Sequence, residues 1–429
     1  MKKRTLENTW VLFDLDGTLT RSEEGIWNSI LHTARVMSLP APDADTLRKM
    51  IGPPLIWSFR EYMGLSEEEA QRGQTIYRER YNTVGLFENQ VYPGIRNVLR
   101  TLRREGARIG LVSGKPENAS RRILEHFGLL TFFERICCAT DGCSEKDALI
   151  RAAVPEKDAA VWMVGDRKFD MEGGRLAGVH TLGVAWGYGS EEELWTSGAE
   201  RIAHTPGEIT EILCPGAEKP RGFFLAMEGL DGCGKGTQTE RLTKTLERYG
   251  FEVVLSREPG GSPIGERIRE ILLDPACGEM EPLTESILYA ASRAQHVRQV
   301  IRPAVEAGKL LLCDRFLDSS AAYQGGGRQL GVEQVLAINA PAVDGTLPDC
   351  TVFLDLGHRD SLERVKDARE PDRLERETED FFARTEEAYH QLIARNPERY
   401  VVVDASRSRD EVAEEIAGQV LRRLFAAED

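Results

Sequence analysis

Two short turns, one near the N-terminus and one past the midpoint, each close an apolar strand, and together they constrain the fold of this chain most. The first is Asp14-Leu-Asp-Gly-Thr18, which follows the run Trp10 to Phe13. The second is Gly229-Leu-Asp-Gly-Cys-Gly-Lys-Gly-Thr237, which follows Phe223 to Met227. The first turn carries two carboxylates, and the second offers backbone N–H groups that can surround phosphates. The chain is therefore predicted to hold two separate phosphate-handling sites.

Apolar strand candidates alternate with helical sequence in both halves, which is typical of a parallel sheet with helices on both faces. In the first half the expected strands are Trp10 to Phe13, Arg108 to Val112, Ile136 to Ala139, Ala160 to Val164 and His180 to Val184. In the second half they are Phe223 to Met227, Glu252 to Ser256, Leu310 to Cys313, Thr351 to Leu356 and Tyr400 to Val403. The predicted fold class is α/β, with two doubly wound parallel-sheet domains.

The length of 429 residues favours more than one domain, because a single core usually serves about 150 residues. Residues 21–90 interrupt the alternation with largely helical sequence and are predicted to form an inserted cap. Residues 214–221 are rich in helix breakers and charge, which indicates a linker. We therefore expect one domain over residues 1–213 and a second over residues 222–429.

Charge and hydropathy exclude several classes of partner. The formal net charge of −15 argues against a nucleic-acid polymer, which is bound through a broad basic surface. No apolar run approaches the roughly 18 residues of a membrane span, and the N-terminus does not resemble a secretory signal. We expect a cytoplasmic protein whose partners are small anionic molecules.

The N-terminal half places further polar residues at the ends of its predicted strands. Asp14 and Asp16 are two apart and share one face of a strand end. Ser113 follows the second strand, Lys146 begins a helix, and Asp166 follows the fourth strand with Asp170 shortly after. Open α/β sheets build their sites at this edge.

Over residues 8 to 213 this set resembles the haloacid dehalogenase-like phosphatases, and Ile51-Gly-Pro-Pro-Leu is similar to the phosphoglycolate phosphatase and 5′-nucleotidase branch. The resemblance implies that Asp14 is a nucleophile forming an aspartyl-phosphate and that Asp16 is the general acid and base. It implies phosphate contacts from Ser113 and Lys146. It also implies a Mg²⁺ site made by Asp14, the Asp16 carbonyl and Asp166, with Asp170 supporting these ligands.

The substrate of this half stays open between nucleoside monophosphates and a phosphoglycolate-type metabolite. A further alternative is a non-catalytic module that senses phosphorylated metabolites.

The second turn has the composition of a phosphate-binding loop that opens a helix. Its glycines permit positive φ angles, and the helix N-terminus faces the anion. Lys235 is expected to reach the β and γ phosphates of ATP. The usual hydroxyl residue after the lysine is replaced by Gly236, so Mg²⁺ is expected to bind through water. The predicted nucleotide-binding residues are Gly229, Gly232, Gly234, Lys235, Gly236 and Thr237.

From Gly222 to the C-terminus the chain resembles thymidylate kinases segment by segment. The matching segments are Arg257-Glu-Pro-Gly-Gly-Ser-Pro, Tyr289-Ala-Ala-Ser-Arg293, Asp314-Arg315-Phe316 and Asp318-Ser-Ser-Ala-Ala-Tyr323-Gln324. The resemblance implies a P-loop nucleoside monophosphate kinase that transfers the γ-phosphoryl group of ATP to dTMP. It also implies a homodimer. The alternative is a kinase of this fold that acts on another nucleotide or on a deoxynucleoside.

Phosphoryl transfer requires positioned cations around converging negative charges. Arg315 is predicted to hold the acceptor phosphate with help from Arg257, while Asp231 orients the transferred group or its metal. A second set is predicted to form the nucleoside pocket: Tyr289, Arg293, Ser320, Tyr323 and Gln324. The resemblance implies that Tyr323 sits where a ribose 2′-OH would clash.

The charged segment 366–375 is similar to the mobile lid of this family. Gly232 occupies a place where some relatives carry a basic residue. The lid is therefore expected to supply the catalytic guanidinium, with Arg369 and Arg373 as the candidates.

Overall fold

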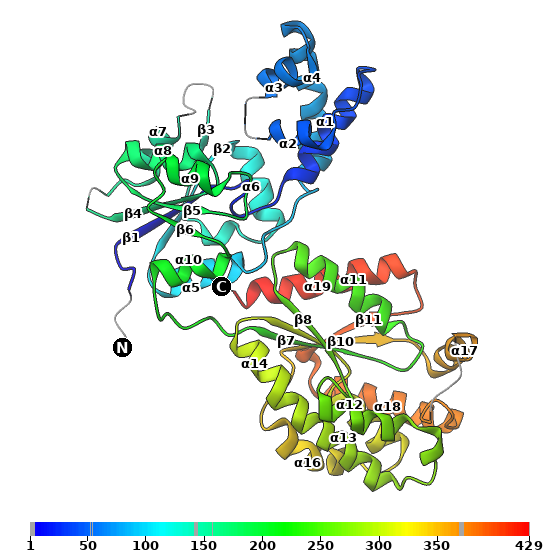
Figure 1. Ribbon diagram of the computed structural model, residues 1–429. Coiled ribbons are helices and arrows are strands. Elements are labelled where there is room, and N and C mark those ends of the chain that lie inside the picture. The colour runs from blue at the N-terminus through cyan, green and yellow to red at the C-terminus, as the bar shows by residue number, and fades with distance from the viewer. Residues whose placement is uncertain are drawn as a thin grey trace. The chain divides into compact units, whose positions relative to one another are not determined.

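The computed structural model describes residues 5–51, 53, 55–140, 145–156, 158–368 and 373–428, with only the backbone described for 366–368. The chain divides into two compact units. The first comprises residues 1–218 with Arg248–Gly250, and the second comprises residues 219–247 and 251–429. The main division falls within residues 214–221. Each unit contains one parallel sheet (Figure 1).

The first unit is built on a six-stranded parallel sheet with the order β3-β2-β1-β4-β5-β6. The five strands expected from the sequence are confirmed. The short edge strand β6 was not predicted, because three residues carry no periodic signal. The strands are β1 (Thr9–Phe13), β2 (Arg108–Pro116), β3 (Arg135–Ala139), β4 (Ala160–Gly165), β5 (His180–Val184) and β6 (Arg201–Ala203).

Side chains of β1 enter a core on each face of this sheet, as expected for a central parallel strand. Val11 and Phe13 pack in one cluster, and Trp10 and Leu12 pack in another. Figure 1 shows α5 and α10 on one side of the sheet and α7 and α8 on the other. The helices outside the cap are α5 (Ile95–Arg104), α6 (Glu117–His126), α7 (Lys146–Ala153), α8 (Lys168–Ala177), α9 (Glu191–Thr196) and α10 (Pro206–Leu213).

The segment between β1 and α5 is helical, as its sequence predicts, and its role as a cap stays a prediction. Ser66 and Glu69 form a capping box that begins α4: Ser66 Oγ accepts from the Glu69 amide, and the Glu69 carboxylate accepts from the Ser66 amide. A short π-helical turn, Tyr81–Gly85, extends α4. The cap helices are α1 (Glu23–Val36), α2 (Ala44–Lys49), α3 (Leu55–Met63) and α4 (Glu67–Arg80).

The second unit is built on a five-stranded parallel sheet with the order β11-β10-β7-β9-β8. All five predicted strands are confirmed, and the α/β class holds for both units. The phosphate-loop strand β7 lies in the centre. The strands are β7 (Phe223–Glu228), β8 (Val253–Arg257), β9 (Leu310–Asp314), β10 (Cys350–Asp355) and β11 (Tyr400–Asp404).

Helices cover both faces of this sheet, with α11 and α19 on one side and α12, α13, α16 and α18 on the other (Figure 1). Among the described residues no helix is both long and apolar enough to cross a membrane. The α-helices are α11 (Lys235–Arg248), α12 (Pro263–Leu273), α13 (Pro282–His296), α14 (Arg302–Glu306), α15 (Leu317–Ser320), α16 (Val332–Val343), α17 (His358–Ala368), α18 (Glu379–Arg395) and α19 (Arg409–Ala426). The shorter helical turns are η2 (Leu130–Phe132), η3 (Pro275–Cys277), η4 (Val297–Ile301), η5 (Ala321–Gly327) and η6 (Pro397–Arg399).

Leu225 and Leu255 offer a matched pair for testing this core, because both are in register with Leu312 of β9. Leu225 is fully buried, whereas Leu255 is 52 % exposed. We expect Leu225→Ala to lower the free energy of unfolding of the second unit by about 2–5 kcal/mol. Leu255→Ala is expected to change it by no more than about 0.5 kcal/mol.

All six tryptophans lie in the first unit, so amide hydrogen exchange in β9 peptides is the appropriate measurement. Equal destabilisation by the two variants would contradict the register and burial described here.

Candidate active sites

The first site lies where β1, β2 and β4 end at the same edge of their sheet. Asp14 follows β1, and its amide donates to the Val164 carbonyl of β4 at 2.9 Å. Gly17 has φ 85°, and a Cβ there would lie 2.2 Å from an Asp166 carboxylate oxygen. Only glycine therefore allows this turn to approach Asp166 so closely.

Three of the predicted acidic residues meet at this edge: Asp14, Asp166 and Asp170 each offer an oxygen within 4.8 Å of the others. Lys146 Nζ lies 2.6 Å from both Asp14 Oδ1 and Asp170 Oδ1. Burial raises the pKa of Asp14 to about 7, although Lys146 opposes the shift. Burial, together with the charges of Asp170 and Asp14, raises the pKa of Asp166 well above its ordinary value.

These carboxylates are the donor type that Mg²⁺ prefers. A divalent cation would favour their ionised forms in a position where burial disfavours them. The residues present therefore fit the cation that the sequence resemblance implies. The carboxylate of Asp16 lies outside this cluster.

Asp16 is paired instead with Lys115, a residue that the sequence analysis did not select. Lys115 Nζ lies 2.9 Å from Asp16 Oδ2 and 2.6 Å from the Tyr81 hydroxyl of the cap. Burial lowers the pKa of Lys115, but Asp16 together with Tyr81 and Tyr77 outweighs burial and holds that pKa well above its ordinary value. Asp16 Oδ1 is buried and has no hydrogen-bond partner among the described residues. The only sequence signal was the position of Lys115 two residues after Ser113.

Ser113 lies within β2, close to the same edge, and is 2 % exposed. Its hydroxyl oxygen accepts from the Lys115 amide at 3.2 Å. The structure thus brings all six predicted residues of this site to one sheet edge, with Lys115 added.

The second site begins with the loop between β7 and α11. Gly229, Gly232 and Gly234 have φ angles of 139°, 85° and 97°, which only glycine adopts readily. Lys235 is 7 % exposed, and its ammonium donates to the carbonyls of Gly229 at 3.0 Å and Leu230 at 2.8 Å. The loop geometry is that of a phosphate nest.

The helix that follows the loop starts at Lys235, and Thr237 is exposed in its first turn. A Cβ at Gly236 would meet nothing within 4 Å. Space therefore does not require glycine at position 236, and the structure gives no steric reason for the missing hydroxyl residue.

Arg315 holds the centre of the second site from the end of β9. Its guanidinium donates to Asp231 Oδ1 at 2.5 Å, the Gly229 carbonyl at 3.0 Å and the Tyr323 hydroxyl at 3.2 Å. The Tyr323 hydroxyl in turn donates to Asp231 Oδ2 at 2.9 Å. Burial raises the pKa of Asp231, but Arg315 and Lys235 outweigh it and hold that pKa below its ordinary value.

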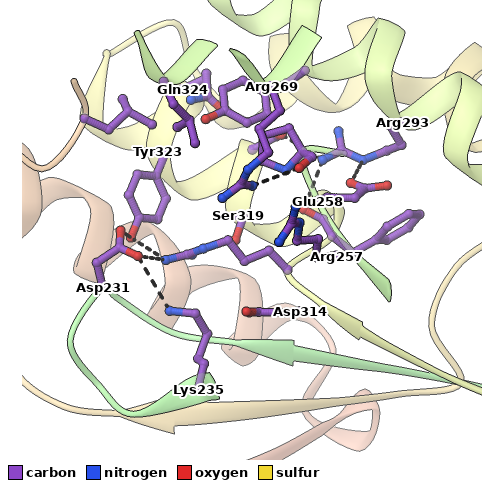
Figure 2. A pocket seen from close by; sticks show the side chains of 17 residues that line it. Asp231, Lys235, Arg257, Glu258, Arg269, Arg293, Asp314, Ser319, Tyr323 and Gln324 are labelled. Atoms are coloured by element: carbon purple, nitrogen blue, oxygen red, sulfur yellow. Dashed lines mark hydrogen bonds and ion pairs between the residues drawn. The ribbon is translucent and has the colours of Figure 1, made fainter. Parts of the chain in front are cut away.

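A cavity of about 230 Å³ opens beside these residues, and Figure 2 shows the ion pair between Asp231 and Lys235 at its edge. Arg257 lies at this cavity and pairs with Glu266 at 3.0 Å. The cavity brings together nine residues predicted from the sequence: Asp231, Lys235, Arg257, Tyr289, Arg293, Arg315, Ser320, Tyr323 and Gln324.

Arg293 is 1 % exposed and is held by four hydrogen bonds. Nε donates to Glu258 at 2.8 Å, and Nη1 donates to the Asn339 side chain. Nη2 donates to the Phe316 carbonyl at 3.1 Å and to Ser320 Oγ at 2.9 Å. A guanidinium has five N–H donors, so these contacts leave one for a ligand.

Of the two predicted lid arginines, Arg369 lies outside the described residues. Arg373 is 7 % exposed. Its Nε donates to the Leu272 carbonyl at 2.8 Å, and its Nη2 lies 2.6 Å from Glu285 Oε2. These contacts tie Arg373 to α12 and α13 rather than to the cavity. A catalytic role for either arginine stays a prediction.

Comparison with known proteins identifies the second unit. Residues 227–416 match the model of the thymidylate kinase family. A thymidylate kinase from Pelotomaculum thermopropionicum is 51 % identical over 189 residues, which cover 44 % of this chain and 88 % of that protein. The chain belongs to the thymidylate kinase family. A second thymidylate kinase, from Halothermothrix orenii, is 48 % identical over 203 residues, or 47 % of this chain and 97 % of that protein.

The remainder of this thymidylate kinase family member matches a different family. Residues 11–184 match the model of the haloacid dehalogenase-like hydrolases. The structure of a predicted phosphatase from Clostridium acetobutylicum is 37 % identical, covers 48 % of this chain and 98 % of its own, and gives a TM-score of 0.44. By its two family matches, the chain combines a thymidylate kinase domain with a haloacid dehalogenase-like hydrolase domain.

Two carboxylates of the thymidylate kinase domain were missed in the sequence analysis. Asp314 lies at the cavity, and its Oδ1 is buried without a hydrogen-bond partner within the described part of the chain. Glu228 is fully buried and accepts from the Phe316 amide at 2.8 Å and from Ser319 Oγ at 2.6 Å. Glu228 ends β7 directly before the phosphate loop, and Asp314 ends β9 directly before Arg315. These positions were the sequence signal by which the two carboxylates could have been found.

Glu228 is expected to make the stability of the kinase domain depend on pH. Burial and the charge of Asp318 raise its pKa to about 7, so the folded chain binds a proton that the unfolded chain has released. The contribution of Glu228 to the free energy of unfolding is therefore full below about pH 4.5 and falls as the pH rises to about 7. The fall is expected to reach about 3 kcal/mol.

Glu228→Gln removes this titration and should flatten the pH dependence of stability of the kinase domain over that range. Hydrogen exchange of β7 peptides in both proteins, at several pH values, measures the difference. Parallel pH profiles for wild type and variant would show that Glu228 is ionised in the folded chain.

Proposed function

We propose that the second unit transfers the γ-phosphoryl group of ATP to dTMP. The observation that carries this proposal is that one cavity is lined by the loop lysine, by the Arg315–Asp231–Tyr323 cluster and by the side chains of Arg293 and Gln324. Lys235 and Arg315 supply the positive charge that a transferring phosphoryl group requires. The names of the closely similar relatives support the same acceptor.

The acceptor nucleotide enters with its phosphate toward Arg315 and its base toward Tyr289 and Arg293. Tyr323 is 4 % exposed and is fixed by its bonds to Asp231 and Arg315. A ring held this rigidly cannot move aside for a ribose 2′-OH. Selection of a deoxyribonucleotide follows.

The cation that accompanies ATP would be held through the unpartnered carboxylate oxygen of Asp314, because Gly236 offers no hydroxyl group. Bound there, Mg²⁺ would neutralise phosphate charge during transfer. Asp231, which stays ionised beside two cations, keeps Lys235 and Arg315 in position.

An acceptor assay with ATP and dTMP, dUMP, UMP, AMP or thymidine tests the assignment. We expect dTMP to give the highest kcat/KM. Preference for AMP or thymidine would place the domain among other kinases of this fold.

Replacement of Lys235 tests the role of the loop. Lys235→Met removes the buried ammonium and is expected to lower kcat by about 10²-fold or more, measured as ADP formation with dTMP. Lys244→Met is the matched control, since Lys244 lies on the same helix with its side chain 71 % exposed, and it should retain full activity. Equal activity of both variants would refute the assigned role.

We propose that the first unit hydrolyses a phosphate monoester through an aspartyl-phosphate on Asp14. Lys146 and Ser113 hold the phosphoryl oxygens, and Asp16 protonates the leaving alcohol and then removes a proton from water. Asp14, Asp166 and Asp170, with the Asp16 carbonyl, would hold Mg²⁺, which would neutralise charge between nucleophile and phosphate. The phosphoglycolate phosphatase and 5′-nucleotidase branch is the proposed place of this domain.

Asp14→Asn tests this proposal with a panel of nucleoside monophosphates and small phosphorylated acids. Phosphate release is expected to fall by at least about 10³-fold, while dTMP phosphorylation is unchanged. Asp158→Asn, at an exposed position, serves as the control and should keep both activities. Absence of turnover in the wild type would support the alternative of a sensing module.

A further inference from the structure

A buried charge network stands behind the acceptor cavity of the kinase. Its centre is Glu285 of α13, which is fully buried. Glu285 Oε1 accepts from Gln324 Nε2 at 2.8 Å and from Arg328 Nε at 3.3 Å. Glu285 Oε2 lies 3.1 Å from Arg328 Nη2 and 2.6 Å from Arg373 Nη2. Two other segments of the chain, one with Gln324 and Arg328 and one with Arg373, therefore converge on this carboxylate of α13.

The charges of this network balance. Arg328 also pairs with Glu377 at 2.6 Å, so two guanidinium groups face two carboxylates. Such pairing offsets the free-energy cost of burying charged groups. Of the five residues in the network, Gln324 alone lines the cavity. The other four act on a ligand only through Gln324.

The network dictates how the Gln324 amide is turned. A carboxylate that is hydrogen-bonded to Arg328 and ion-paired with Arg373 is a pure acceptor, so the amide must direct its NH₂ group to Glu285. Its Oε1 is then the atom left for a ligand in the cavity that Gln324 lines (Figure 2). A carbonyl oxygen there attracts a ring N–H and repels a bare ring nitrogen.

We propose that Glu285 is a positioning residue that fixes Gln324 with its oxygen toward the acceptor base, and thereby selects a pyrimidine whose N3 carries a hydrogen. Thymine and uracil carry this hydrogen, whereas N3 of cytosine is a bare acceptor. The inference rests on the proposed function, in which the base of the acceptor enters this cavity.

Glu285→Gln tests the inference. The replacement amide can donate as well as accept, so Gln324 is free to turn its NH₂ group toward the cavity. We expect the ratio of kcat/KM for dTMP to kcat/KM for dCMP to fall at least tenfold. Because both substrates are measured on one preparation, the ratio is independent of the fraction of folded enzyme.

Glu281→Gln is the matched control, since Glu281 precedes α13 at an exposed position, and it should leave the ratio unchanged. If Glu285→Gln yields no folded protein, Glu285→Asp withdraws the carboxylate by one carbon and is expected to lower the ratio in the same way. The Kd values of dTMP and dCMP give a second measure of the same discrimination.

An equal loss with both substrates, or a ratio within about twofold of wild type, would show a structural role only and overturn the inference. If the wild type phosphorylates dTMP and Glu285→Gln leaves the ratio of kcat/KM values unchanged, this inference alone is refuted. A wild-type chain inactive on dTMP and without affinity for it refutes the proposed function and the inference together.

Discussion

The rest of the structure depends on one electrostatic constraint: cations that can bind phosphate are buried, and each must be paired where it lies. Lys146 pairs with Asp14 in the first site, and Arg315 pairs with Asp231 in the second. Without these carboxylates each cation would be a buried charge with no paired carboxylate, which lowers the free energy of unfolding. With them, the cations stay charged and held in place for an anionic substrate.

Parallel sheets meet this constraint because the ends of neighbouring strands meet at one edge, where the chain leaves the core. Both units use that edge, but with different chemistry. The first gathers carboxylates around Asp14 and suits a nucleophile beside a divalent cation. The second lines its cavity with the ammonium of Lys235 and with guanidinium groups, which suits the transfer of a phosphoryl group between two nucleotides.

Much of this could be predicted from the sequence, because glycine turns after apolar strands have few structural alternatives. The α/β class, ten strands and the helical cap followed from local pattern. Lys115 and Glu285 did not, since a lysine near a strand end or a glutamate in a helix carries no local signal of a distant partner. Their roles depend on Tyr81 and on Gln324, which only the folded chain brings near. For Arg373 the local sequence did suggest a role, because its charged context predicted a lid. That context gave no sign of the buried ion pair between Arg373 and Glu285.

The central claim is that one chain carries two separate sites for transferable phosphate. Phosphorus NMR of the full-length chain with Mg²⁺, ATP, dTMP and a panel of phosphate monoesters tests it most directly. The account predicts dTDP and ADP from the nucleotides, together with inorganic phosphate from at least one ester. Consumption of ATP without dTDP, or no change in any phosphorus resonance, would contradict it.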